Sequence, residues 1–244
     1  MIIDDIRTVE RDGLQFSFRH EEEFEAIYKA IFEEEDYNFI TTNPSPRIID
    51  AGSHIGIAAL YFKRRYPTAQ VVCFEPNPTT FKLLEKNISQ NRLEDITLVN
   101  AAVATAKGKI KFYVSKDEQM PWTWGDSAAM NKWVSDETTK TIKVNSVRLS
   151  EYINQEVDLL KLDVEGSEEE VLKEAEEKLI NVKQIFMEFH GSSTNPTNDS
   201  EKILTLLKRN GFSYKIIQDG KQVEEQEISK DDPYWLIIHA YREE

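Results

Sequence analysis

Short apolar runs alternate with amphipathic segments of helical length through most of the chain, and this alternation is the feature that most constrains the fold. Three runs in the first half are typical of buried strands: RIIDAG (47–52), VVCFEP (71–76) and ITLVNAAV (96–103). The segments between them, 54–66 and 79–91, carry apolar residues at helical spacing. Strands that alternate with helices form parallel sheets with right-handed crossovers, so the pattern predicts a doubly wound α/β fold.

The second half of the chain continues the alternation after an interruption. Its strand candidates are EVDLLKLDVEG (156–166), VKQIFMEFHG (182–191), FSYKIIQ (212–218) and YWLIIHAY (234–241), with helices expected at 168–180 and 200–210. Residues 104–156 are predicted to form a β-rich insertion with two extra strands. We expect residues 1–46 to be an N-terminal helical extension, with an amphipathic helix at 20–35 packed on the core, and residues 47–244 to be the main domain.

Charge and composition narrow the range of partners. Lysine and arginine number 30 against 44 aspartates and glutamates, which gives a net charge of −14. Such a chain is repelled by polyphosphate and by anionic lipid, so we expect neither nucleic acid nor a membrane as partner. The one cysteine, Cys73, excludes an intrachain disulfide, and no run approaches the ~20 apolar residues that span a bilayer. We therefore expect a cytoplasmic protein.

The turn after the first strand indicates a ligand-binding edge. Gly52 lets the backbone approach a ligand closely, and Gly56 lets the following helix pack against the strand. The spacing Gly52-x-x-x-Gly56 departs from the dinucleotide fingerprint G-x-G-x-x-G, which argues against pyrophosphate. Glu75, at the end of the next strand, is placed to accept hydrogen bonds from both hydroxyls of a ribose, although an exposed acid at a strand end is the alternative.

Two later strand ends carry acids and a histidine at a spacing of two. Asp163 and Glu165 follow the run LLKL, and Glu188 and His190 end the run FMEFHG, so each pair shares one face of its strand. If the two strands are neighbours, three carboxylates and an imidazole converge. Such a cluster can activate a hydroxyl or hold a divalent ion. The alternative is a set of surface acids and a histidine bound to a backbone carbonyl.

The order of these motifs resembles the FkbM family of S-adenosylmethionine-dependent methyltransferases. The matching elements are IIDAGSHIG, FEPNP, LVNAAV, LLKLDVEGSEEEVL and IFMEFH, which together span roughly residues 22–215. The K-x-D-x-E-G-x-E element is the most specific of them. Ser53 and His54 stand where the family's turn, D-x-G-A-N-x-G, has Ala-Asn.

The resemblance implies a class I, Rossmann-like sheet of seven strands with the last strand antiparallel, partly covered by the N-terminal helix and the insertion. S-adenosylmethionine is the implied cofactor. The implied cofactor-binding residues are Asp50, Gly52, Ser53 and Gly56 around the methionine part, Glu75 at the ribose, Asn100 and Ala101 at the adenine, Asp163 near the sulfonium and Ser127 toward the amino-acid end.

The function that follows is O-methylation of a hydroxyl on a sugar or small-molecule natural product. The candidate catalytic residues are His190, Asp163, Glu165 and Glu188. His190 is the first choice as base because an unperturbed imidazole titrates nearest neutral pH. We expect no obligatory metal. Trp122, Trp124 and Trp133 are candidates for stacking on the acceptor, with a place in the core as the alternative.

Two other functions stay open at this point. One is a nucleotide-dependent oxidoreductase, which the departure from the dinucleotide fingerprint argues against. The other is a non-catalytic binding protein with the same fold. The N-terminal helix is also a candidate lid or homodimer contact.

Overall fold

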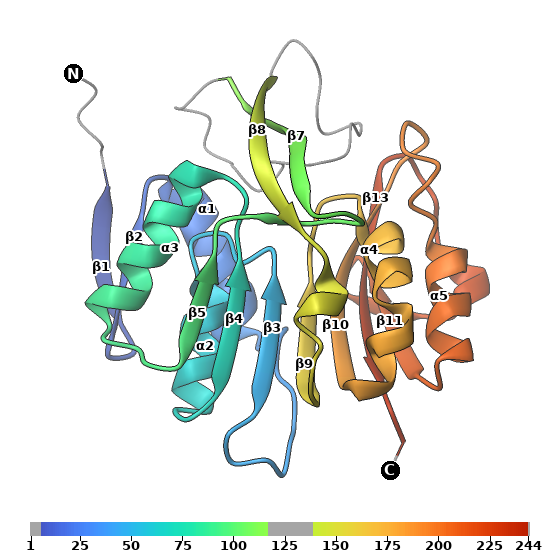
Figure 1. The fold of residues 1–244 in the computed structure, drawn as a ribbon, viewed down its shortest axis with the longest axis horizontal. Helices are drawn as coiled ribbons and strands as arrows, with labels where there is room; N and C mark the ends of the chain where they lie inside the picture. Colours follow the sequence, from blue (N-terminus) through green and yellow to red (C-terminus); the bar gives the residue numbers. More distant parts are fainter. Residues whose placement is uncertain (1–5, 117–138, 244) are drawn as a thin grey trace.

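The computed structural model describes residues 6–116 and 139–243, and its centre is one sheet of eight strands (Figure 1). The strand order is β12-β11-β13-β10-β9-β3-β4-β5. The strands are β3 (Arg47–Ala51), β4 (Gln70–Phe74), β5 (Ile96–Val99), β9 (Val157–Leu162), β10 (Val182–Gly191), β11 (Ser213–Gln218), β12 (Lys221–Val223) and β13 (Tyr234–Tyr241).

Five adjacent strands, β5, β4, β3, β9 and β10, run parallel. The last strand, β13, is antiparallel to both of its neighbours, as expected. The expected count of seven strands is wrong, because β12 adds an eighth. It pairs with β11 across a tight turn in which Asp219 and Gly220 both have positive φ. The three residues of β12, Lys-Gln-Val, carry too little apolar pattern to predict a strand.

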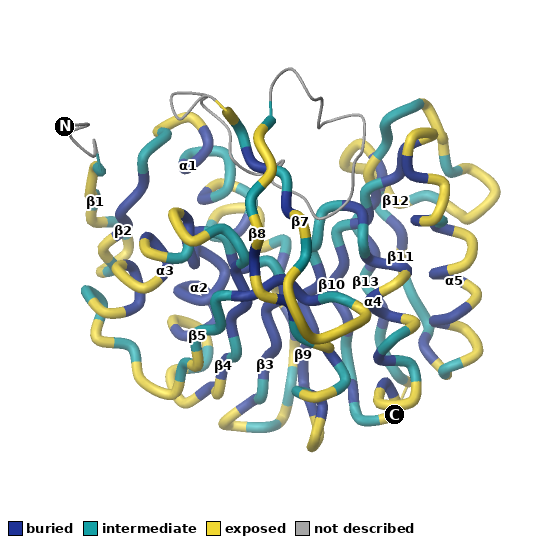
Figure 2. Tube along the Cα trace, turned by 45° about the horizontal axis from the view of Figure 1, so that its top comes forward, coloured by how far each residue is buried: buried dark blue, intermediate teal, exposed yellow. Residues whose placement is uncertain are grey.

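Helices cover both faces of the sheet. On one face lie α1 (Glu21–Tyr28), α2 (Ile57–Arg65) and α3 (Pro78–Gln90), and on the other lie α4 (Glu168–Glu174) and α5 (Ser200–Arg209). Ile48 packs in the core on the side of α1, α2 and α3, and its neighbour Ile49 packs in the core on the side of α4 and α5. Successive strand residues point to opposite faces of the sheet. The buried strands stand out in Figure 2.

The N-terminal extension is more than a helix. A hairpin of β1 (Arg7–Arg11) and β2 (Leu14–Phe18), which sequence reasoning missed, precedes α1, and α1 continues as a π-helix, η1 (Lys29–Glu33). Phe16 contacts the rings of Phe24 and Tyr28, so the hairpin and the helix share one aromatic core. The Ser17 backbone N–H donates to Asn87 Oδ1 at 2.7 Å, which attaches the hairpin to α3.

A second sheet lies at the carboxyl end of the main one (Figure 1). It consists of β6 (Ala102–Val103), β8 (Thr139–Val147) and β7 (Gly108–Ser115), in that order. The two strands expected in the insertion are therefore present. The expected strand 96–103 is divided between the two sheets, with Asn100 and Ala101 at the break. Ser127 and the three tryptophans of the insertion lie outside the described residues.

Within residues 6–116 and 139–243, no helix combines the length and the apolar composition needed to cross a bilayer.

Candidate active site

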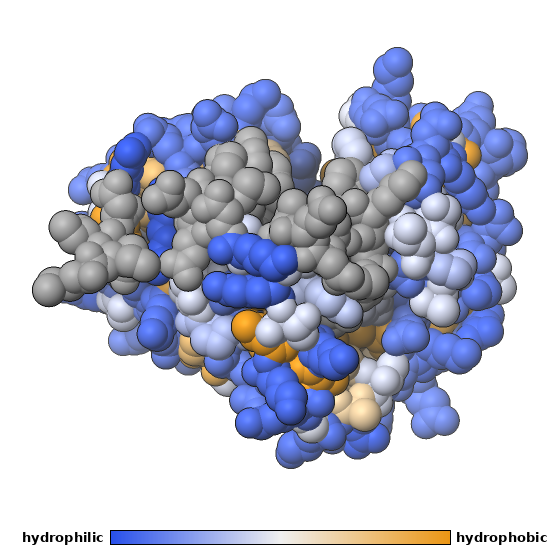
Figure 3. All heavy atoms as spheres, turned by 90° about the horizontal axis from the view of Figure 1, so that it is seen from above, coloured by the Kyte–Doolittle hydropathy of each residue, from blue (hydrophilic) through white to orange (hydrophobic). Residues whose placement is uncertain are grey.

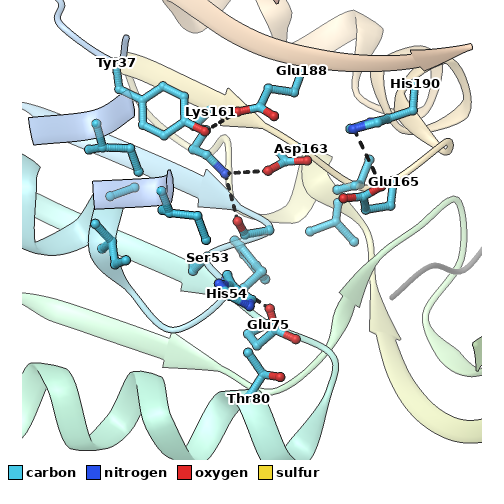
Figure 4. A pocket seen from close by; sticks show the side chains of 18 of the residues that line it. Tyr37, Ser53, His54, Glu75, Thr80, Lys161, Asp163, Glu165, Glu188 and His190 are labelled. Carbon is cyan, nitrogen blue, oxygen red and sulfur yellow. Dashed lines mark hydrogen bonds and ion pairs between the residues drawn. The ribbon is translucent and has the colours of Figure 1, made fainter. Parts of the chain in front are cut away.

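A cavity of about 780 Å³ lies at the carboxyl ends of the parallel strands. One end is lined by the turn after β3 and by Glu75, and the other by Tyr37, Glu188 and His190 (Figure 4). Ala26, Ile27, Ala30 and Ile31 of the N-terminal extension line it as well, opposite Trp235 and Ile237 of β13. Viewed from above, much of the surface around the residues that are not described is hydrophilic (Figure 3).

The turn after β3 is held tightly to its neighbours. Gly52 has a φ of +91°, and a Cβ placed on it would lie 1.8 Å from the carbonyl oxygen of Asp163. The N–H groups of Gly52 and Ser53 both donate to the Phe74 carbonyl, at 3.1 and 2.9 Å. Gly52 and Ser53 line the cavity, whereas Gly56 lies behind it, where a Cβ would meet Leu84 at 2.6 Å. Gly56 therefore permits packing of α2 on α3.

Glu75 is 6% exposed, and its carboxylate is oriented by backbone donors. Oε2 accepts from the His54 N–H at 3.0 Å, and Oε1 accepts from the Asn77 N–H at 2.8 Å. Each carboxylate oxygen accepts more than one hydrogen bond, so this arrangement suits a ligand with two hydroxyls. Asn100 does not line the cavity. Its Nδ2 donates to the Glu75 carbonyl at 2.8 Å, so it supports the loop, while Ala101 forms part of the wall.

Asp50, expected beside the cofactor, also lies behind the wall. It is fully buried, and its carboxylate is 3.5 Å from the ammonium of Lys161. Burial raises the pKa of Asp50, against the lowering effect of Lys161. Asp163 lines the cavity beside them, and its Oδ1 is buried without a hydrogen-bond partner in the structure. Sequence reasoning did not select Lys161, because the sequence of an apolar run does not show which groups a lysine within it will contact.

His190 lies between two carboxylates. Its Nδ1 is 3.1 Å from Glu168 Oε1, and its Nε2 is 3.6 Å from Glu165 Oε2. Glu168, which sequence reasoning did not select, is fully buried and also accepts from the Gly166 N–H. Burial lowers the pKa of His190, but Glu165 and Glu168 outweigh it and raise that pKa well above its ordinary value. Asp163, Glu165 and His190 also present ligand atoms within 4.8 Å of one another, a set with the chemistry to hold a cation.

The register of β9 and β10 explains why these residues meet. Leu162 pairs with Met187, so the residues just after β9 face the end of β10. Glu188 also receives a hydrogen bond from the hydroxyl of Tyr37, a residue of the N-terminal extension. Burial is the largest of the effects that raise the pKa of Glu188, with the neighbouring Asp163 next. Tyr37 belongs to no recognisable motif, and only the packing of the extension brings it to the cavity.

The residues present fit S-adenosylmethionine, the cofactor that the resemblance implies. Gly52 lines the cavity with its backbone alone, and Glu75 is an oriented acceptor at the next strand end. The unpartnered Asp163 Oδ1 supplies negative charge to complement a sulfonium.

Comparisons with known proteins identify the family. The model of the Methyltransferase FkbM domain matches residues 50–214. Methyltransferase sdnD of Sordaria araneosa is 28% identical over 236 residues, covering 84% of this chain and 88% of that protein. The 2-O-methyltransferase NoeI of Sinorhizobium fredii is 27% identical over 159 residues, covering 60% of this chain and 64% of that protein.

A solved structure agrees on the fold. The crystal structure of M. jannaschii TYW2 in complex with AdoMet covers 99% of this chain and 88% of its own, with a TM-score of 0.52 at 12% identity. The resemblance drawn from the motifs and the cofactor that it implied are thus confirmed. With the glycine turn, Glu75 and the KLDVEG strand end placed around one cavity, the match shows that the chain belongs to the FkbM family of methyltransferases, whose methyl donor is S-adenosylmethionine.

Proposed function

We propose that the protein transfers a methyl group from S-adenosylmethionine to a hydroxyl on a sugar or small molecule. The observation that carries the proposal is the single cavity that joins the glycine turn and Glu75 at one end to Asp163, Glu188 and His190 at the other. The name of NoeI, a 2-O-methyltransferase, supports an oxygen acceptor.

The cofactor, when bound, supplies an electrophilic methyl group. The protein must hold the acceptor hydroxyl in line with it and receive the hydroxyl proton as the new bond forms. Of the acids at this end of the cavity, Glu188 is our choice for the base. It lines the cavity, and burial raises its pKa, which makes its carboxylate a stronger base than an exposed one.

We prefer Glu188 to His190 as the base because of the groups that flank the imidazole. A ring flanked by Glu165 and Glu168, with its pKa raised well above the ordinary value, holds a proton near neutral pH. A protonated imidazole has no lone pair with which to take another proton. We assign His190 instead to ordering Glu165 beside the acceptor.

The Tyr37 hydroxyl orients one oxygen of Glu188, and the apolar wall from Ala26 to Ile31 limits access of water to the reacting atoms. Asp163, which lines the cavity just after β9, would place negative charge near the sulfonium of a bound cofactor. These groups position and desolvate the reactants, which is the main contribution a protein makes to a direct displacement.

The test is mass spectrometry of a library of sugars and hydroxylated metabolites after incubation with the protein and S-adenosylmethionine. A mass increase of one methylene group that depends on both supports the proposal. Isothermal titration with S-adenosylmethionine and NAD is the companion measurement. Binding of NAD alone would favour an oxidoreductase, and binding of neither would favour a non-catalytic protein.

A further inference from the structure

The ammonium of Lys161 is buried between the end of β3 and the end of β9. Lys161 is 2% exposed. Its Nζ donates to the Gly52 carbonyl at 2.8 Å and to Asp163 Oδ2 at 3.2 Å, and it lies 3.5 Å from Asp50 Oδ1 (Figure 4). One side chain of β9 thereby connects the glycine turn after β3 with the acid after β9.

The contacts of Lys161 extend to the acceptor end of the cavity. Its ammonium lies 5.3 Å from the centre of the Tyr37 ring, whose hydroxyl donates to Glu188. A cation at this distance is attracted to the face of an aromatic ring. Lys161 therefore contacts or approaches a group at each part of the cavity: the turn, the acid at its middle and the tyrosine at its far end.

Charge balance explains why the site needs a cation here. Asp50 is fully buried, and Asp163 and Glu188 lie in the same network. Buried carboxylates repel one another and are costly without a paired cation. Without Lys161, Asp50 would be left without an opposite charge, and the Gly52 carbonyl would lose its side-chain donor. The side chain of Asp163, 21% exposed, would then lose the ion pair that orients its carboxylate.

We propose that Lys161 is the positioning residue of the cofactor site, holding the Gly52 turn and the Asp163 carboxylate in the geometry that receives S-adenosylmethionine. It acts through these two groups and not by taking part in the transfer. The proposal rests on the cofactor and not on the identity of the acceptor, so it is testable before any acceptor is known.

The chain offers a matched control in Lys63. Lys63 is also buried, at 5% exposed, and its Nζ also donates to a backbone carbonyl, that of Ala69 at 2.8 Å. It lies on α2 and does not line the cavity. Replacing Lys63 also removes a buried charge and a hydrogen bond to a backbone carbonyl. It leaves the Gly52 turn and Asp163 untouched.

The test compares Lys161→Met with Lys63→Met by isothermal titration and by hydrogen–deuterium exchange. We expect Lys161→Met to bind S-adenosylmethionine at least tenfold more weakly, about the effect of losing one hydrogen bond to a charged group. We expect Lys63→Met to bind it like the wild type. In Lys161→Met, amide exchange should accelerate at Gly52 and Ser53 and in residues 163–166, and stay unchanged in peptides from α5 and β11. Lys161→Arg, which keeps the charge and the donors, should recover part of the affinity.

Wild-type affinity in Lys161→Met would overturn the proposal. So would exchange that accelerates evenly over the chain, because that result describes a lysine needed only for stability. If Lys161→Met does not fold, Lys161→Gln, which keeps a donor for the Gly52 carbonyl but no charge, is judged by the same two measurements. If the wild type itself does not bind S-adenosylmethionine, the proposed function fails instead, and the two failures are therefore distinguishable.

Discussion

Replacing Gly52 with alanine tests how closely the turn after β3 approaches the end of β9. The new Cβ would lie 1.8 Å from the Asp163 carbonyl oxygen, and the residue would be forced to keep a φ of +91°. Atoms in contact cannot approach so closely, and the obstacle is backbone within a parallel pair of strands, β3 and β9. One strand end must therefore move.

Gly52→Ala should lower the free energy of unfolding for two reasons. Holding a residue other than glycine at a left-handed φ costs about 1–2 kcal/mol. Overpacking in a buried region adds about 1–3 kcal/mol, and contact with rigid backbone favours the upper end. In a protein of this size each kcal/mol of unfolding free energy lowers Tm by about 2–4 °C. We expect Gly52→Ala to lower Tm by about 4–20 °C and to abolish measurable binding of S-adenosylmethionine.

Gly13 is the control, because its φ of +76° is similar and a Cβ there would have nothing within 4 Å. Gly13→Ala should therefore show only the conformational part of the cost, about 1–2 kcal/mol, and keep its cofactor affinity. Thermal unfolding followed by circular dichroism, with isothermal titration on the same samples, checks both. Equal Tm values for the two variants, or cofactor binding retained by Gly52→Ala, would refute the reasoning.

Four further outcomes are expected. Glu75→Ala should weaken binding of S-adenosylmethionine about 10- to 150-fold, the loss of about 1.5–3 kcal/mol in charge-assisted hydrogen bonds, and an unchanged Kd would contradict the ribose assignment. Tyr37→Phe should lower Tm more than Tyr28→Phe, because the first removes a donor to the half-buried Glu188 and the second a donor to the exposed Asp12; equal losses would contradict this. The pKa of His190 is raised in the folded state. Its contribution to the stability of the fold should therefore be complete below about pH 6.5 and decline as pH rises through the folded pKa. A Tm difference between wild type and His190→Gln that grows with pH would contradict this. Once an acceptor is known, turnover should survive EDTA, and turnover that disappears and returns with Mg²⁺ would show that the cluster of acids holds an essential ion.

Local chemistry explains what was predictable from the sequence. The turn after β3 could be located because Gly52 must adopt a positive φ, and glycine does so at little cost. The parallel strands could be located because a buried parallel strand is a near-continuous apolar run, as residues 71–74 of β4 are. Glu188 and His190 could be paired because both lie in β10 and strand residues two apart share a face. Each inference needed only neighbours along the chain.

The roles within the site depend on contacts across the fold. Asp50 and Asn100 looked like cofactor ligands, yet their partners are Lys161 and the Glu75 carbonyl. His190 was expected to lie near carboxylates, and packing identifies them as Glu165 and Glu168, one beside each ring nitrogen.

Contacts across the fold also decided the positions of segments that belong to no motif. Tyr37 entered the site because the extension folds across it, and β12 formed because a turn returned the short Lys-Gln-Val segment to the sheet edge. A side chain's residue type determines which bonds it can form, and this is written in the sequence. Which atoms it meets depends on strand register and on how distant segments pack, so only the tertiary structure decided which acids line the cavity and which support its wall from behind.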